Sequence, residues 1–171
     1  YGNGSEEYPF KSVDLAITDA VDGDKIFISE GTYELDSMSN GGTSGSGIYD
    51  QGKCLEIYGE NEKTILIYDA STTTQRDGPA MRLENANTKV RNLTYIFKPK
   101  SGSRHQKGIF TYCKGTIENV FFRISGSNTA SYLYYNSQSI PTNVINCTFF
   151  HDLGSVNSNY SGKCNFSNIA T

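Results

Sequence analysis

Three segments of similar sequence decide the fold: T-K-V-R-N-L-T-Y-I-F at 88–97, T-I-E-N-V-F-F-R-I at 116–124 and T-N-V-I-N-C-T-F-F-H at 142–151. Each contains one asparagine at the equivalent position, and consecutive asparagines lie 27 residues apart. A fainter copy, C-N-F-S-N-I-A-T, follows at 164–171. A repeat of this length, made of short strands with no helix inside it, predicts a β-solenoid in which each coil pairs with the one before.

Apolar residues alternate around each asparagine, as expected for strands with one buried side. Two residues before it, one after it and three after it the side chain is apolar in all three segments, so these positions should form the core. They are Val90, Ile117, Val144, Leu93, Val120, Cys147, Tyr95, Phe122 and Phe149. The outward positions are then Thr94, Ile96, Phe121, Arg123, Thr148 and Phe150.

The repeated asparagines Asn92, Asn119 and Asn146 suit corners between strands. Asparagine tolerates the left-handed backbone conformation, and its amide can bond the local backbone or the equivalent amide one coil away. We therefore expect a structural asparagine ladder rather than a catalytic or glycosylated site. Cys147, at a core position, is expected to act as a small buried hydrophobe rather than as a disulfide or redox group.

Composition agrees with a chain of strands and turns. Of the 171 residues, 36% are hydrophobic and 19% are charged, whereas Ser, Asn, Thr and Gly together make 66. Such a composition argues against a helical bundle. A net charge of -3 gives no general attraction to nucleic acid, and no apolar run is long enough to span a membrane.

The clearest helix signal lies at 10–24 (FKSVDLAITDAVDGD). Val13, Ile17, Ala20 and Val21 have helical spacing behind a possible N-cap at Ser12, and Asp22-Gly23 should end the helix. Residues 25–171 are expected to form the coils. Expected strands are 25–29, 54–58, 64–68, 80–83, 90–97, 109–113, 117–124, 132–135 and 144–150, with glycine-rich or serine-rich loops such as 36–52 between them.

The chain resembles a known superfamily through the segment from Phe10 to Tyr33, through C-L-E-I-Y-G-E-N-E-K-T-I-L-I at 54–67 and through its repeats. It is similar to the right-handed parallel β-helix proteins of the pectin-lyase-like superfamily. The resemblance implies one all-β domain over 1–171, a right-handed parallel β-helix of roughly six or seven coils with a short N-terminal capping helix.

The superfamily includes polysaccharide lyases, pectin esterases, phage tailspikes and bacterial adhesins. In the Y-G-N-G-S opening and the N-C-T-F-F unit, the local sequence most resembles the adhesin-like surface proteins of methanogenic archaea. We therefore expect an extracellular or cell-surface domain, non-catalytic, that binds glycan or another surface. The alternative is a polysaccharide lyase, or a related carbohydrate-active enzyme, acting on acidic polysaccharide.

The outward residues of the repeats bear on the choice between a binding domain and a lyase. A β-helix lyase needs a basic residue and, usually, carboxylates that hold Ca²⁺ against the substrate. No Asp or Glu lies among the six outward positions given above. We expect no metal site and no cofactor, with Ca²⁺ required only if the lyase alternative holds.

The best candidate site in the sequence is the basic loop K-P-K-S-G-S-R-H-Q-K at 98–107, which has no acid nearby and could bind an acidic glycan. A solvated loop without a ligand is the other interpretation. In a lyase, Arg104 or Lys107 would be the base and His105 a proton shuttle. Tyrosines of the 125–142 insertion could stack on sugar rings or serve in strand packing. The proposed ligand-binding residues are Lys98, Lys100, Arg104, His105, Lys107, Tyr132, Tyr134 and Tyr135.

The segment 168–171 breaks off partway through what resembles another coil. An uncovered last coil would expose a sheet edge and the end of the core. We therefore expect either a fragment of a longer β-helix or a second chain that covers this end. The expected partners are a polysaccharide or cell-surface glycan, or further coils or another chain at the C-terminal end, with no nucleic acid and no membrane span.

Overall fold

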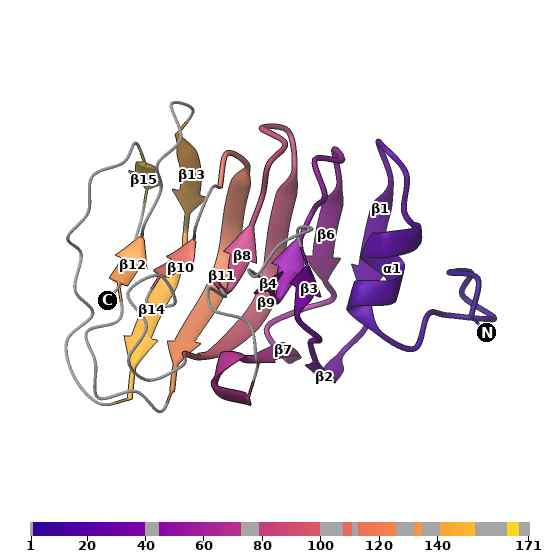
Figure 1. Cartoon of the computed structure of the whole chain (residues 1–171), viewed down its shortest axis with the longest axis horizontal. Helices are drawn as coiled ribbons and strands as arrows, with labels where there is room; N and C mark the ends of the chain where they lie inside the picture. Colours follow the sequence, from indigo (N-terminus) through magenta and orange to yellow (C-terminus); the bar gives the residue numbers. More distant parts are fainter. Residues whose placement is uncertain are drawn as a thin grey trace.

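Strands dominate the fold. A computed structural model describes residues 2–39, 45–72, 79–99, 108–110, 113–125, 132–134, 141–152 and 164–167. Within them one short α-helix, α1 (Val13–Asp19), precedes a series of strands, and a 3₁₀ turn, η1 (Ala70–Thr72), follows one of them. Figure 1 shows the strands side by side along the long axis of the molecule, with α1 beside β1 at the N-terminal end.

The described strands form a nine-stranded parallel sheet, a four-stranded parallel sheet and one antiparallel pair. The main path of the large sheet is β1 (Lys25–Ile28), β6 (Glu56–Gly59), β9 (Lys89–Lys98), β11 (Thr116–Ile124), β13 (Thr142–Ile145) and β15 (Cys164–Ser167). Beside this path lie β2 (Gly31–Glu34), β7 (Thr64–Asp69) and β14 (Thr148–His151). Strand β2 pairs with β7, β7 with the later half of β9, and β14 with the later half of β11. The smaller sheet contains β5 (Ile48–Tyr49), β8 (Met81–Arg82), β10 (Gly108–Phe110) and β12 (Tyr132–Tyr134), and β3 (Met38–Ser39) pairs with β4 (Gly45–Ser46).

The repeat predicted from the sequence sets the register of the central strands. Lys89 pairs with Thr116 and Thr116 with Asn143, so the partner lies 27 residues further along the chain each time. The repeated asparagines have φ of 59° (Asn92), 53° (Asn119) and 51° (Asn146). The amide of Asn119 donates to Oδ1 of Asn92 at 3.2 Å, 27 residues earlier. The left-handed conformation predicted for the three asparagines is confirmed, and the predicted amide contact is present between Asn92 and Asn119.

The predicted core positions of the repeat are also confirmed. All nine side chains are at most 1% exposed. The rings of Tyr95 and Phe122 lie 5.9 Å apart and those of Phe122 and Phe149 4.9 Å apart, while the buried Tyr95 hydroxyl donates to the Ala80 carbonyl at 2.7 Å. Cys147 is a free buried thiol whose Sγ donates to the Ile145 carbonyl, and burial raises its pKa to about 11. It is a small core residue, as predicted.

The helix begins where the sequence predicts and ends earlier. The Ser12 side chain accepts a hydrogen bond from the Leu15 amide, which confirms the N-cap. The helix ends at Asp19, because Ala20 adopts an extended ψ of 148° and the Asp24 carboxylate accepts from the Val21 amide at 2.8 Å. Val21 is therefore 64% exposed, and its predicted place on the buried helical face is wrong.

Two strand predictions differ from the structure. The expected strand 144–150 is interrupted at the Asn146 corner, which separates β13 from β14. The stretch 36–52, expected as a loop, contains β3, β4 and β5. Burial explains this second difference, because Met38 and Ile48 pack into the hydrophobic core despite the glycines and serines around them.

Candidate ligand-binding face

The outward side of β1, β6 and the start of β9 brings together aromatic and charged side chains. Strand alternation turns Ile26, Ile57 and Val90 inward, where they are buried, so the residues on either side of them point out. The register places these outward residues in two rows of three. We call this the N-terminal face; its residues are Lys25, Phe27, Glu56, Tyr58, Lys89 and Arg91.

The first row of this face is Phe27, Tyr58 and Arg91. The Phe27 and Tyr58 rings are tilted by 54° with centroids 5.5 Å apart, and the Arg91 guanidinium carbon lies 4.8 Å from the Tyr58 centroid. The Phe27 side chain is 54% exposed. An aromatic ring that packs on a neighbouring ring of the sheet and is open to solvent on its other side can contact the apolar face of a ligand.

The second row is Lys25, Glu56 and Lys89, and the Glu56 carboxylate contacts two cations. Its Oε1 accepts from Nε of Arg91 at 2.9 Å and lies 2.8 Å from the second guanidinium nitrogen, while Oε2 lies 3.3 Å from the Lys25 ammonium. The hydrogen bond from Arg91 lowers the pKa of the Glu56 carboxyl; partial burial opposes this, and the hydrogen bond from Lys25 and both positive charges add to it. Glu56 is therefore ionised at neutral pH and holds both cations beside the aromatic pair.

The side chains of this face are of the kind that binds a ligand. Among the residues that the structure describes, no group of three or more His, Cys, Asp or Glu side chains could hold a metal ion. The N-terminal face offers hydrogen-bond donors and an acceptor around an apolar ring, which is how sites for small polar ligands are built.

The outward face of the later strands has a different character. Phe121 is 38% exposed and Phe150 is 51% exposed, as their predicted outward orientation requires. Arg123 forms two hydrogen bonds with the Asp152 carboxylate, at 2.9 and 3.2 Å. This bidentate pair holds the guanidinium in place next to an apolar surface.

Of the basic loop predicted as a site, the structure describes Lys98. It ends β9, and its ammonium lies 3.3 Å from the Asp69 carboxylate on β7. The expectation of a basic cluster with no acid nearby is therefore wrong for Lys98, because strand pairing brings in a carboxylate that is remote in sequence. Four other proposed loop residues and one tyrosine lie outside the described residues: Lys100, Arg104, His105, Lys107 and Tyr135.

Tyr132 and Tyr134 lie in β12, at the end of the path of the four-stranded sheet. Lys98 lies in the nine-stranded sheet. The described residues of the predicted ligand site, Lys98 and the two tyrosines, therefore belong to different sheets.

Sequence reasoning missed the N-terminal face. The alternation of Ile26 with Phe27 and of Ile57 with Tyr58 was visible, but the spacing between these strands differs from the 27-residue repeat. The neighbours Phe27, Tyr58 and Arg91 could not be aligned without the register.

No protein family, curated protein or solved structure matches the chain. No helix within the described ranges is long and apolar enough to cross a membrane.

Proposed function

We propose that the chain is an adhesin-like parallel β-helix domain, displayed outside the cell or at its surface, that binds an acidic glycan without turning it over. The N-terminal face is the proposed binding surface. The observation that carries the proposal is the exposed Phe27 ring, packed on the half-buried Tyr58 beside the Glu56–Arg91 ion pair.

The β-helix part of the proposal rests on strand order. Strands of the four-stranded sheet alternate along the chain with strands of the nine-stranded sheet, and the pairs within both sheets are parallel. Asparagine corners divide β9 and β11 at equivalent positions. These features, together with the sequence resemblance, support a right-handed coil of the pectin-lyase-like kind.

The glycan part rests on the chemistry of the N-terminal face. A sugar ring has an apolar face of C–H groups and an edge of hydroxyls. The Phe27 ring can cover the apolar face, the Glu56 carboxylate accepts from hydroxyls, and the Arg91 guanidinium donates to oxygens.

Charge favours an acidic sugar over a neutral one. The N-terminal face contains three cations, Lys25, Lys89 and Arg91, and one carboxylate, Glu56. Glu118 lies opposite Arg91 on β11 and borders the face. The cations still outnumber the carboxylates, so a uronate or another anionic sugar is the ligand class that the surface favours.

Calorimetric titration with oligouronates and with neutral oligosaccharides of the same length tests this proposal. We expect saturable binding of the oligouronate, at least about tenfold weaker binding of the neutral sugar, and a loss of about tenfold for Phe27→Ala, since a tenfold change is about 1.4 kcal/mol. Phe121→Ala is the matched control, because Phe121 is an exposed aromatic residue of the same sheet away from this face. An absence of binding, or an equal loss for Phe121→Ala, would contradict the proposal.

The pH dependence of the same titration gives a second check. Because the pKa of Glu56 is lowered in the folded chain, its carboxylate stays ionised as the pH falls to the usual glutamate range of about 4.3. Binding should be constant from about pH 8 to 5 and should weaken below about pH 4, whereas Glu56→Gln should bind weakly at every pH. Absorbance of unsaturated product, measured with and without Ca²⁺, would reveal turnover and replace the proposal by the lyase alternative.

A further inference from the structure

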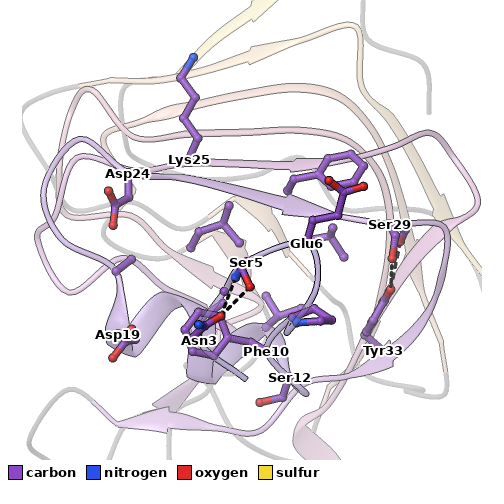
Figure 2. A pocket seen from close by; sticks show the side chains of 18 residues that line it. Asn3, Ser5, Glu6, Phe10, Ser12, Asp19, Asp24, Lys25, Ser29 and Tyr33 are labelled. Atoms are coloured by element: carbon purple, nitrogen blue, oxygen red, sulfur yellow. Dashed lines mark hydrogen bonds between the residues drawn. The ribbon is translucent and has the colours of Figure 1, made fainter. Parts of the chain in front are cut away.

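A hollow of about 970 Å³ lies at the N-terminal end of the molecule, between β1, α1 and the segment 2–10 (Figure 2). Its floor is apolar: Val13, Ala16, Ile26 and Ile28 are at most 9% exposed. Exposed polar side chains, including Glu6, Asp19, Asp24 and Lys25, surround it. The hollow adjoins the N-terminal face at β1, because Lys25 and Phe27 line the hollow and also belong to the face.

The hollow runs along a sheet edge, because β1 pairs with β6 on one side alone. The Glu56 amide donates to the Asp24 carbonyl and the Glu60 amide to the Ile28 carbonyl. In a parallel pair the backbone groups of alternate residues point to opposite sides of the strand. The N–H and C=O groups of Lys25 and Phe27 therefore point away from β6, toward the open edge.

Nothing in the described part of the chain pairs with that edge. The segment 2–10 lies over the hollow, yet the amides of Asn3 and Gly4 both donate to the Tyr8 carbonyl, so it folds on itself. A row of unpaired backbone groups beside an apolar floor is a template for an added strand.

The charges around the hollow indicate what kind of strand would fit. The carboxylates of Glu6, Asp19 and Asp24 form no ion pair among the described residues. Lys25 is already paired with Glu56, at 3.3 Å. The surroundings of the hollow are therefore acidic.

We propose that an extended basic peptide segment binds here by adding a strand to β1. Its backbone would bond the outward N–H and C=O groups of Lys25 and Phe27, and alternate apolar side chains would enter the hollow beside Ile26 and Ile28. Lys or Arg side chains on the segment would meet the three carboxylates. Main-chain bonding supplies the affinity, and the charge supplies the selectivity.

Fluorescence polarisation with labelled hexapeptides tests the inference. We expect saturable binding of Lys-Val-Lys-Val-Lys-Val, at least about tenfold weaker binding of Glu-Val-Glu-Val-Glu-Val, and weakening of the first as salt rises. Equal affinity for the two peptides, or no binding of the basic one at millimolar concentration, would overturn the proposal.

Two variants separate strand addition from simple charge attraction. Phe27→Pro removes an outward N–H and should weaken the basic peptide at least about tenfold. Thr32→Pro is its control: the Gly31 amide donates to the Lys63 carbonyl at the start of β7, so the amide of Thr32 points away from β7. The double variant Glu6→Gln/Asp19→Asn, at two exposed positions, should also weaken binding about tenfold, which tests the contribution of charge. If Phe27→Pro does not fold, the same basic peptide with N-methylated backbone amides decides the matter, because it keeps the charge and loses its main-chain donors. It should bind at least about tenfold more weakly, and equal affinity for it would refute strand addition. Unchanged affinity in the folded variants would refute strand addition at β1.

Discussion

The chain bends between successive strand segments of the nine-stranded sheet in two ways. In the N-terminal part, β6 ends at Gly59 and a turn at 60–63 precedes β7. In the later part, β9 and β11 each pass the corner through one asparagine in the left-handed conformation. Gly59 follows Tyr58 as Asn92 follows Arg91, and Tyr58 pairs with Arg91, so these are equivalent positions with different backbone conformations.

The two kinds of corner are stabilised by different contacts. In the N-terminal corner the Glu60 amide donates to the Ile28 carbonyl at 2.9 Å, and the buried Thr64 hydroxyl accepts from the same amide at 3.2 Å. In the later corner the Asn119 amide donates to Asn92. Paired residues lie 27 positions apart from β9 to β11 and from β11 to β13, whereas Lys25 and Glu56 lie 31 apart and Glu56 and Lys89 lie 33 apart. Of the N-terminal face, Lys25, Phe27, Glu56 and Tyr58 lie on β1 and β6, before multi-residue turns, whereas Lys89 and Arg91 lie on β9, before the Asn92 corner.

The largest expected effect is at Gly59. A Cβ here would clash with the Asn92 carbonyl oxygen and would lie 2.8 Å from Cβ of Thr64. Because a backbone atom cannot move away cheaply, Gly59→Ala should lower the free energy of unfolding by about 2–3 kcal/mol. Urea denaturation measures this. A loss under about 0.5 kcal/mol would show that the two corners do not pack as tightly as the geometry indicates.

An intermediate effect is expected at Asn119. Alanine pays roughly 1–2 kcal/mol in the left-handed region, and the amide bond to Asn92 is lost as well. Asn119→Ala should therefore destabilise the chain by about 1–2 kcal/mol in the same assay, and Asn119→Gly by less, because glycine accepts this conformation. Both variants lose the side-chain amide, so if the glycine variant is the less stable of the two, the left-handed backbone conformation is not the source of the cost of alanine at this corner.

The sequence predicted the later part of the chain well because one residue type marks each corner. With Asn92, Asn119 and Asn146 aligned, the alternation on either side identified the buried Leu93 and Phe122 correctly. Strand geometry and burial both follow from a local pattern there.

The N-terminal part was harder to predict because its neighbours are set by pairing across turns of variable length. Nothing local to Phe27 indicates that Tyr58 will stack on it or that Arg91 will follow. Lys98 shows the same limit, since its partner Asp69 is brought in by the pairing of β9 with β7. The N-terminal face could therefore not be predicted from the 27-residue repeat alone.

The smallest expected effect is at the ion pair of the N-terminal corner. The Lys63 ammonium lies 3.7 Å from the Glu30 carboxylate, and both side chains are well exposed, at 69% and 49%. Glu30→Gln removes the charge and keeps an oxygen that can accept from the Asn61 amide, so it should change the free energy of unfolding by less than about 0.5 kcal/mol. Urea denaturation at low and high salt measures this. A loss above about 1 kcal/mol that disappears in salt would mean that charge, and not the Thr64 hydroxyl with its backbone partners, stabilises the N-terminal corner.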